Sequence, residues 1–141
     1  MKTVAIMQPT YLPWVGYFNM INLVDEFILL DSVQFTKRTW QQRNQIKTAQ
    51  GAMWLTVPVM SKGLRGQLIS DTKIDCHGKF PAVHVATIQN NYGRAKYYDK
   101  YAPSLFRILE DGNTSLASLN INLIEWFCRQ LGIDTPFILT S

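Results

Sequence analysis

The sequence predicts an α/β domain: a three-layer, Rossmann-like, mostly parallel sheet flanked by helices, with a small hairpin insertion. Two apolar runs, 3–7 and 26–31, lack polar alternation, which is typical of strands buried on both faces of a parallel sheet. The apolar spacing over 16–23 allows a short helix between them, and strand, helix and strand within about thirty residues is the length of a βαβ unit. A third apolar run at 136–140, after a long helical pattern, extends this arrangement.

The middle of the chain supplies the hairpin and further short strands. Residues 32–50 are polar, amide-rich and basic, unlike the apolar runs that precede and follow them. Residues 52–60 have the pattern of a strand that Pro58 ends or places at a sheet edge. We expect one more short strand around 73–75.

Helical patterns dominate the second half of the chain. Pro81 suits the first position of a helix that runs to about residue 90, because its missing N–H has no intrahelical partner there. A second helix is expected over 97–110, with a break or a restart at Pro103.

The last helix carries recognisable signals at both ends. Thr114 or Ser115 is a suitable N-cap, and Gly132 stands where a left-handed residue closes a helix. Asn120 lies among the apolar residues of this helix, and a buried amide needs hydrogen-bonding partners. It therefore either bonds a neighbouring helix or anchors a loop.

The composition narrows the class of protein. A chain of 141 residues with 47% hydrophobic residues suits a single packed domain, 1–141. The formal net charge of +4 favours an anionic small molecule as partner and makes nucleic acid a weaker candidate. Two isolated cysteines fit a reducing compartment, and no apolar run approaches the length of a membrane span. We therefore expect a cytoplasmic protein without a metal site, and the sequence identifies no cofactor.

The loop from Gln8 to Tyr17 follows the first predicted strand and is the first candidate site. Ligands of open α/β sheets bind beyond the carboxyl ends of the strands. The rings of Tyr11 and Trp14 suit stacking on a base or sugar, and Gly16 lies at a helix start, where free N–H groups favour phosphate or carboxylate. The alternative is a proline-stiffened turn whose aromatic side chains fill the core.

A second candidate segment, 31–44, follows the second predicted strand. It mixes positive charges with amides and with the rings of Phe35 and Trp40, and arginine and lysine are suited to phosphate and carboxylate groups. The alternative is a solvated hairpin with surface charges. The residues with expected substrate contacts are Asp31, Gln34, Lys37, Arg38, Arg43 and Asn44.

Common catalytic signatures are missing. There is no G-x-S-x-G, Walker A or G-x-G-x-x-G motif, and no cysteine–histidine nucleophile pair. His84 falls on the helix after Pro81, where a surface or capping role is favoured over that of a general base.

Several motifs together resemble the WbqC-like family of bacterial proteins. The main matches are the stretches 7–18 and 31–38, followed by Trp40-Gln41 and Arg43-Asn44. Weaker matches are 54–59, Leu119-Asn120 and 131–133, so that the resemblance covers nearly the whole chain. Members of this family typically continue further, and residues 1–141 are therefore expected to be the N-terminal part of a longer family member.

The resemblance implies a role in bacterial surface-polysaccharide (O-antigen) biosynthesis. The implied enzyme is a transferase that acts on a nucleotide-linked amino sugar, with transfer of glycine or a related acyl group. In that reading Asp31 and Lys37 are the expected catalytic residues, and the other candidates bind substrate. The expected substrate-binding residues are Gln8, Tyr11, Trp14, Gly16, Gln34, Arg38, Arg43 and Asn44.

A second, looser resemblance is to the nucleotidyltransferase superfamily. Trp14-Val15-Gly16-Tyr17 occupies the place of its HxGH motif, with the glycine kept and both histidines replaced. Such an altered enzyme would need Lys37, Arg38 or Arg43 to stabilise phosphate in place of histidine. A non-catalytic sugar- or nucleotide-binding or scaffold module is the remaining alternative, and a homo-oligomer stays open.

Overall fold

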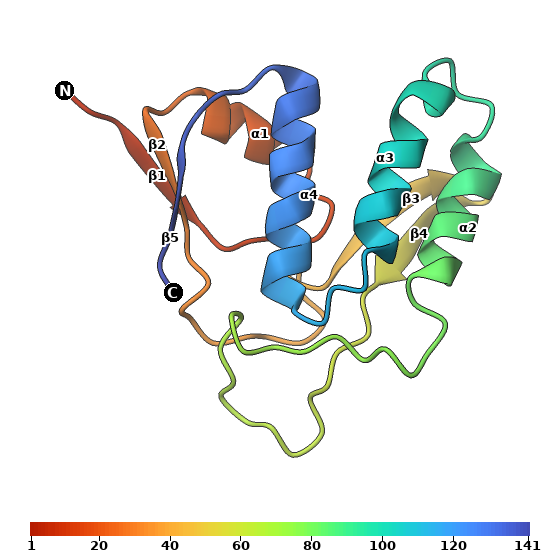
Figure 1. Ribbon diagram of the computed structural model, residues 1–141, viewed down its shortest axis with the longest axis horizontal. Helices are drawn as coiled ribbons and strands as arrows, with labels where there is room; N and C mark the ends of the chain where they lie inside the picture. The colour runs from red at the N-terminus through yellow and green to blue at the C-terminus, as the bar shows by residue number, and fades with distance from the viewer.

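The computed structural model describes residues 1–141 and confirms the α/β class. A three-stranded parallel sheet has the order β1-β2-β5, formed by β1 (Val4–Met7), β2 (Glu26–Leu29) and β5 (Phe137–Leu139). The predicted small hairpin is the antiparallel pair of β3 (Arg43–Thr48) and β4 (Gly51–Thr56). Figure 1 shows the parallel sheet and the hairpin at opposite sides of the molecule, with helices between them.

The predicted βαβ unit opens the chain. Helix α1 (Val15–Asn22) connects β1 to β2, which pair in parallel from Val4 opposite Glu26 to Met7 opposite Leu29. Because parallel neighbours need a crossover connection, α1 returns the chain to the amino-terminal edge of the sheet.

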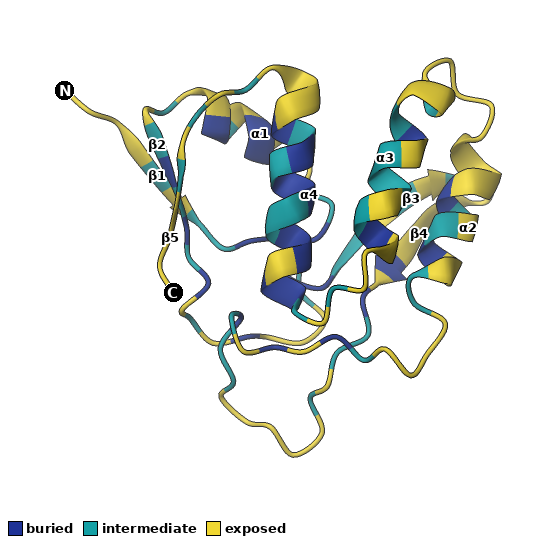
Figure 2. Ribbon diagram, viewed as in Figure 1, coloured by how far each residue is buried: buried dark blue, intermediate teal, exposed yellow.

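Helix α1 and the last helix of the chain cover one face of the parallel sheet. Phe27 and Leu29 are fully buried there against α1 and the last helix. On the opposite face, Ile6 and Ile138 flank Ile28 in one row across the sheet and are 55% and 42% exposed. Figure 2 shows exposed positions on β1 and β5. Within these residues helices cover one face of the sheet, because both crossovers run on the same side.

Three helices follow the hairpin: α2 (Ala82–Tyr92), α3 (Tyr98–Glu110) and α4 (Leu116–Leu131). The end signals of α4 are confirmed, since the Ser115 side chain accepts a hydrogen bond from the backbone N–H of Ser118 and Gly132 closes the helix at φ 68°.

The break expected at Pro103 is wrong, because α3 is continuous across it. The proline lies in the second turn, so its missing N–H removes one bond near the helix start. Ala102 and Leu109 of the same helix are buried, and this packing holds α3 together through the proline.

Two strand predictions in the middle of the chain need correction. The strand expected over 52–60 is shorter, because β4 ends two residues before Pro58. The segment 73–75 forms isolated bridges to Val59 and to Ser115 instead of a strand. A single segment held between two different partners has too few consecutive pairs with either one to form a ladder.

The apolar residues form two clusters, and α4 contributes to both. Leu119 of α4 packs with Tyr11 and with Ile88 of α2 in the larger cluster. Ile124, one turn further, packs against Phe27 of the sheet in the smaller one. Helix α4 therefore joins the sheet half of the molecule to the hairpin half.

Candidate functional site

The two candidate segments lie against each other at the carboxyl end of β1. Gln41 donates from its side-chain amide to Oε1 of Gln8 at 2.7 Å. The backbone N–H of Tyr11 donates to the carbonyl of Trp40 at 2.9 Å. The two segments are about thirty residues apart in the sequence, and they meet because each follows the carboxyl end of one of two neighbouring parallel strands.

Asn120 fastens both segments to α4. Its side-chain amide is fully buried and donates to the carbonyl of Gln41 at 2.7 Å and to that of Pro9 at 3.3 Å. Of the two roles expected for this residue, the structure shows the loop anchor.

A cavity of about 330 Å³, here called the aromatic cavity, lies between these segments. Trp14 and Trp40 lie on its rim with about half of each residue exposed, and the Gln8–Gln41 amide pair forms part of its wall. Thr10 also lines it, and the hydroxyl of this residue is buried without a hydrogen-bond partner. Exposed rings beside amides suit a sugar or a nucleobase.

Gly16 controls the position of the Trp14 indole. A Cβ atom at residue 16 would lie 2.6 Å from Nε1 of Trp14, closer than side chains pack. The indole also packs against the buried ring of Tyr17, with ring centroids 5.6 Å apart and ring planes at 75°. Gly16 thus leaves space for the ring on the first turn of α1, and it does not itself line either cavity of the candidate site.

A second cavity, of about 520 Å³ and here called the basic cavity, is lined by the first part of the segment 34–41, whereas the aromatic cavity is lined by its last part. Gln34 and Lys37 line it together with the turn 61–67, which adds Lys62 and Arg65. Gly63 and Gly66 of this turn have φ values of 75° and 72°, which glycine adopts without strain. Three positive charges around one polar cavity suit a phosphate or diphosphate group.

The sequence patterns did not single out Lys62 and Arg65, the turn residues that line the basic cavity. Their signal was present, because Ser61-Lys62-Gly63-Leu64-Arg65-Gly66 alternates basic residues with glycines. What the sequence could not show is the bridge between Gln34 and Leu68, which places this turn against the predicted segment.

Asp31 follows Leu30, a residue of the aromatic cavity, and its own carboxylate is engaged elsewhere. It is 3% exposed at the end of β2, and its carboxylate accepts hydrogen bonds from the hydroxyls of Thr140 at 3.1 Å and Ser141 at 2.7 Å. These contacts join the ends of β2 and β5. Asp31 lines neither cavity.

Arg38, Arg43 and Asn44 also lie outside the lining of the two cavities. The Arg43 guanidinium lies 4.1 Å from the ring centroid of Trp54, which in turn packs against Trp40 at 5.6 Å. Arg43 therefore supports the rim of the aromatic cavity through two indoles that pack at an angle of 41°.

Asn44 and Arg38 are both involved in left-handed backbone conformations, Asn44 through its partner Leu12 and Arg38 through its own φ angle. The side-chain amide of Asn44 donates to the carbonyl of Leu12, a residue with φ of 45°, and so holds the loop after β1 in a left-handed conformation. Arg38 has φ of 60°, and its backbone N–H donates to the Gln42 side chain at 2.9 Å while its own side chain is exposed.

Tyr11 is fully buried, so its ring has no surface with which to stack on a ligand. Nε2 of His84 lies 3.1 Å from the carbonyl of Thr56 and must donate to it, and Nδ1 therefore accepts from the Tyr11 hydroxyl at 2.7 Å. Burial lowers the pKa of His84, and the bond to Thr56 opposes this shift. Burial also raises the pKa of Tyr11.

The expectation of a surface or capping histidine is therefore wrong. His84 is a buried, neutral residue that fastens the loop after β1 to α2 and to β4. Its sequence position on a helix face gave no sign of the tyrosine that faces it from 73 residues away.

Two further observations concern metal ions and membranes. No group of three or more His, Cys, Asp or Glu side chains lies close enough to share a metal ion. None of the four helices combines the length and the apolar character that a membrane crossing requires.

The fold and the site define an α/β domain with ligand-sized cavities next to the carboxyl end of a parallel strand. The model of the WbqC-like protein family matches residues 8–141, and the chain belongs to this family, as the resemblance in the sequence implied. An uncharacterized protein of Mycobacterium tuberculosis is 46% identical over 136 residues, which is 96% of this chain and 58% of that relative. No solved structure matches the chain.

Proposed function

We propose that this chain binds a nucleotide-linked amino sugar as part of a transferase of bacterial surface-polysaccharide (O-antigen) biosynthesis. The observation that carries the proposal is the pair of cavities lined from one segment, 34–41. Its first part contributes Lys37 to the basic cavity, and its second part contributes Trp40 and Gln41 to the aromatic cavity. A nucleotide sugar has the matching composition, a diphosphate linked to flat or cyclic polar groups.

In this proposal the diphosphate occupies the basic cavity, where Lys37, Lys62 and Arg65 supply positive charge. A ring of the ligand occupies the aromatic cavity between the indoles of Trp14 and Trp40. Sugar and base edges carry both donors and acceptors, which the amide side chains of the wall can satisfy.

The proposed reaction is transfer of a glycyl or related acyl group to the sugar amine. The amine nitrogen attacks the carbonyl carbon of the activated donor, an amide bond forms, and the donor's leaving group departs with its bonding electrons. Lys37 would stabilise the negative charge that develops on the carbonyl oxygen. Asp31 would accept the amine proton, which requires that its carboxylate exchange the hydroxyls of Thr140 and Ser141 for the substrate.

Binding is tested first, by isothermal titration of the protein with UDP-glucosamine, UDP and glucosamine. We expect Arg65→Ala to weaken UDP binding by about tenfold or more, because a hydrogen bond to a charged group contributes about 1.5–3 kcal/mol. Lys79→Ala, an exposed lysine outside both cavities, is the matched control and should bind normally. The proposal fails if none of the three compounds binds or if the two variants behave alike.

A second candidate is a binding module without catalysis. The observation that favours it is the engagement of Asp31, whose two carboxylate oxygens already accept hydrogen bonds within the protein. Incubation of the protein with UDP-glucosamine and a glycyl thioester separates the candidates, with mass spectrometry as readout. A glycylated nucleotide sugar supports the transferase, whereas binding without product supports the module.

A further inference from the structure

A third cavity lies on the far side of the loop after β1 and shares no residue with the other two. It has a volume of about 600 Å³ and lies among α2, α3, the end of α4 and strand β3. Of its 15 lining residues, 13 are hydrophobic, and Lys96 is the only charged one. This apolar cavity has the volume of a small-molecule site, since such sites measure about 300–1,000 Å³.

We propose that the apolar cavity binds an anionic single-chain amphiphile, with the apolar chain inside and the acidic head group at Lys96. The walls present aromatic and aliphatic side chains, including Tyr98, Leu105 and Phe127. No acidic residue lines the cavity, so nothing in the lining repels an acidic head group. This proposal does not depend on the nucleotide-sugar site.

The rim carries a second positive charge of the same kind. The Lys96 ammonium lies 5.1 Å from the ring centroid of Tyr97, and that of Lys100 lies 5.0 Å from the ring of Tyr101. Both tyrosines line the cavity. Lys96 lines the cavity itself, and Lys100 lies next to it in the structure through the ring of Tyr101, so both charges are available to an acidic head group of a bound chain.

Hydrogen bonds within the protein hold two side chains of the cavity wall in place. The indole N–H of Trp126, which is 6% exposed, donates to the hydroxyl of Ser104 at 3.0 Å. The hydroxyl of Tyr92 accepts the backbone N–H of Lys47 at 3.0 Å and so connects α2 to β3. Because these two groups of the lining are already paired, an apolar chain beside them leaves neither one without its hydrogen bond.

The cavity also leaves large apolar residues uncovered. Leu131 and Tyr97, both in its lining, are 58% and 57% exposed. A bound chain would remove part of this surface from water, and each buried methylene should tighten binding about three- to fourfold.

The four tryptophans allow a direct test, because each reports on a different place. Trp126 lines the apolar cavity, Trp14 and Trp40 line the aromatic cavity, and Trp54 lines none of them. The indole N–H signals in two-dimensional NMR are followed during titration with sodium laurate below its micelle concentration. We expect a saturable shift of the Trp126 signal with the other three unmoved. UDP-glucosamine should instead move the signals of Trp14 and Trp40. The proposal for the apolar cavity and the proposal for the nucleotide-sugar site are therefore tested by different signals.

Two comparisons sharpen the test. Sodium octanoate should bind much more weakly than laurate, and dodecyltrimethylammonium, which has a chain of the same length but a positive head group, should bind at least tenfold more weakly. Ala95→Phe, at an exposed position in the cavity lining, should block the Trp126 shift. Ala86→Phe, at an exposed position on α2 outside the lining, is the matched control and should leave it unchanged.

Three results would overturn the proposal. The first is no Trp126 shift with laurate, and the second is an equal shift of all four indoles, which indicates non-specific detergent binding. The third is a Trp126 signal that moves with protein concentration alone, together with a dimer in sedimentation velocity. That result would mean that a second copy covers the cavity.

Discussion

Gly16 illustrates how one residue can affect binding and stability in opposite directions. We expect Gly16→Ala to displace the Trp14 indole, because the added Cβ would lie 2.6 Å from its Nε1 atom. Loss of ring stacking should weaken UDP-glucosamine binding about fivefold or more, since stacking of a base on an aromatic ring is worth about 1–3 kcal/mol. The free energy of unfolding should stay the same or rise, because alanine favours helix over glycine by up to about 1 kcal/mol.

Indole NMR and titration calorimetry measure the displacement and the affinity of this variant. Gly78→Ala is the control, because a Cβ at residue 78 meets nothing within 4 Å. An unmoved Trp14 signal with normal binding would show that glycine is not needed at position 16.

At the residue scale, the positions after the strand ends predicted some of the residues that line the two cavities of the candidate site and not the others. Gln8, Trp14, Gln34 and Lys37 do line the two cavities, because they follow strands whose ends the sequence shows. Tyr11 lies in the same loop and points into the core. Its direction depends on His84, a partner from a distant helix that no local pattern reveals.

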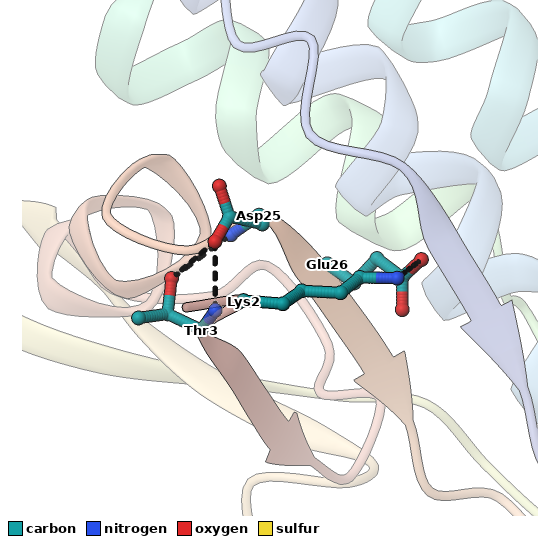
Figure 3. A network of polar contacts seen from close by, with 4 residues as sticks. All are labelled: Lys2, Thr3, Asp25 and Glu26. Atoms are coloured by element: carbon teal, nitrogen blue, oxygen red, sulfur yellow. Dashed lines mark hydrogen bonds and ion pairs between the residues drawn. The ribbon is translucent and has the colours of Figure 1, made fainter.

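At the scale of elements, the amino-terminal edge of the parallel sheet is joined by a charged contact. Figure 3 shows the Asp25 carboxylate at the start of β2, where it accepts from the backbone N–H of Thr3 at 2.7 Å and from its hydroxyl at 2.8 Å. The neighbouring residues Lys2 and Glu26 form an ion pair. The bonds of Asp25 connect the residue before β1 to the residue before β2, and the ion pair joins Lys2 to the first residue of β2.

The backbone hydrogen bond from Thr3, with the hydroxyl bond second, lowers the pKa of Asp25. A carboxyl with a lowered pKa in the folded state stabilises the fold above its ordinary pKa, and this contribution disappears as the pH falls through the lowered value. We expect Asp25→Asn to have a lower melting temperature than the unmodified protein near neutral pH and the same melting temperature in strong acid.

Thermal unfolding from about pH 7 to about pH 2 measures this difference. Asp134→Asn, which changes an exposed carboxylate without a hydrogen bond, should show no such pH dependence. A constant difference between Asp25→Asn and the unmodified protein at all pH values would contradict the role given to the charge.

Elements were predictable where their signals are local. The ends of α4 follow from Ser115 and Gly132, whose side chain and backbone act within one turn of their own positions. The segment 73–75 and the continuity of α3 at Pro103 depend on packing partners elsewhere in the chain. Local patterns carry no information on those partners, and both predictions failed for that reason.

At the scale of the whole molecule, α4 connects the two apolar clusters and both candidate segments, 8–17 and 31–44. Its buried residues Leu116, Leu119 and Leu123 belong to the cluster near the hairpin, whereas Ile121, Ile124 and Cys128 pack in the cluster under the sheet. Asn120 lies between Leu119 and Ile121 and donates to the carbonyls of Pro9 and Gln41. The position of the aromatic cavity therefore depends on a single amide in a helix more than 70 residues away from either loop in sequence.

Asn120→Ala tests this dependence. The substitution leaves two buried carbonyls without their donor, and each buried group left unsatisfied costs about 1–3 kcal/mol. We expect a lower urea midpoint for unfolding together with weaker UDP-glucosamine binding, because the loops that carry Gln8 and Gln41 lose their common anchor. Asn122→Ala, two positions further along α4 at a side chain that makes no hydrogen bond, should change neither property. Equal urea midpoints for the two variants would show that Asn120 is not needed to hold the loops. Their anchor would then be the direct hydrogen bonds between them, from Gln41 to Gln8 and from Tyr11 to Trp40.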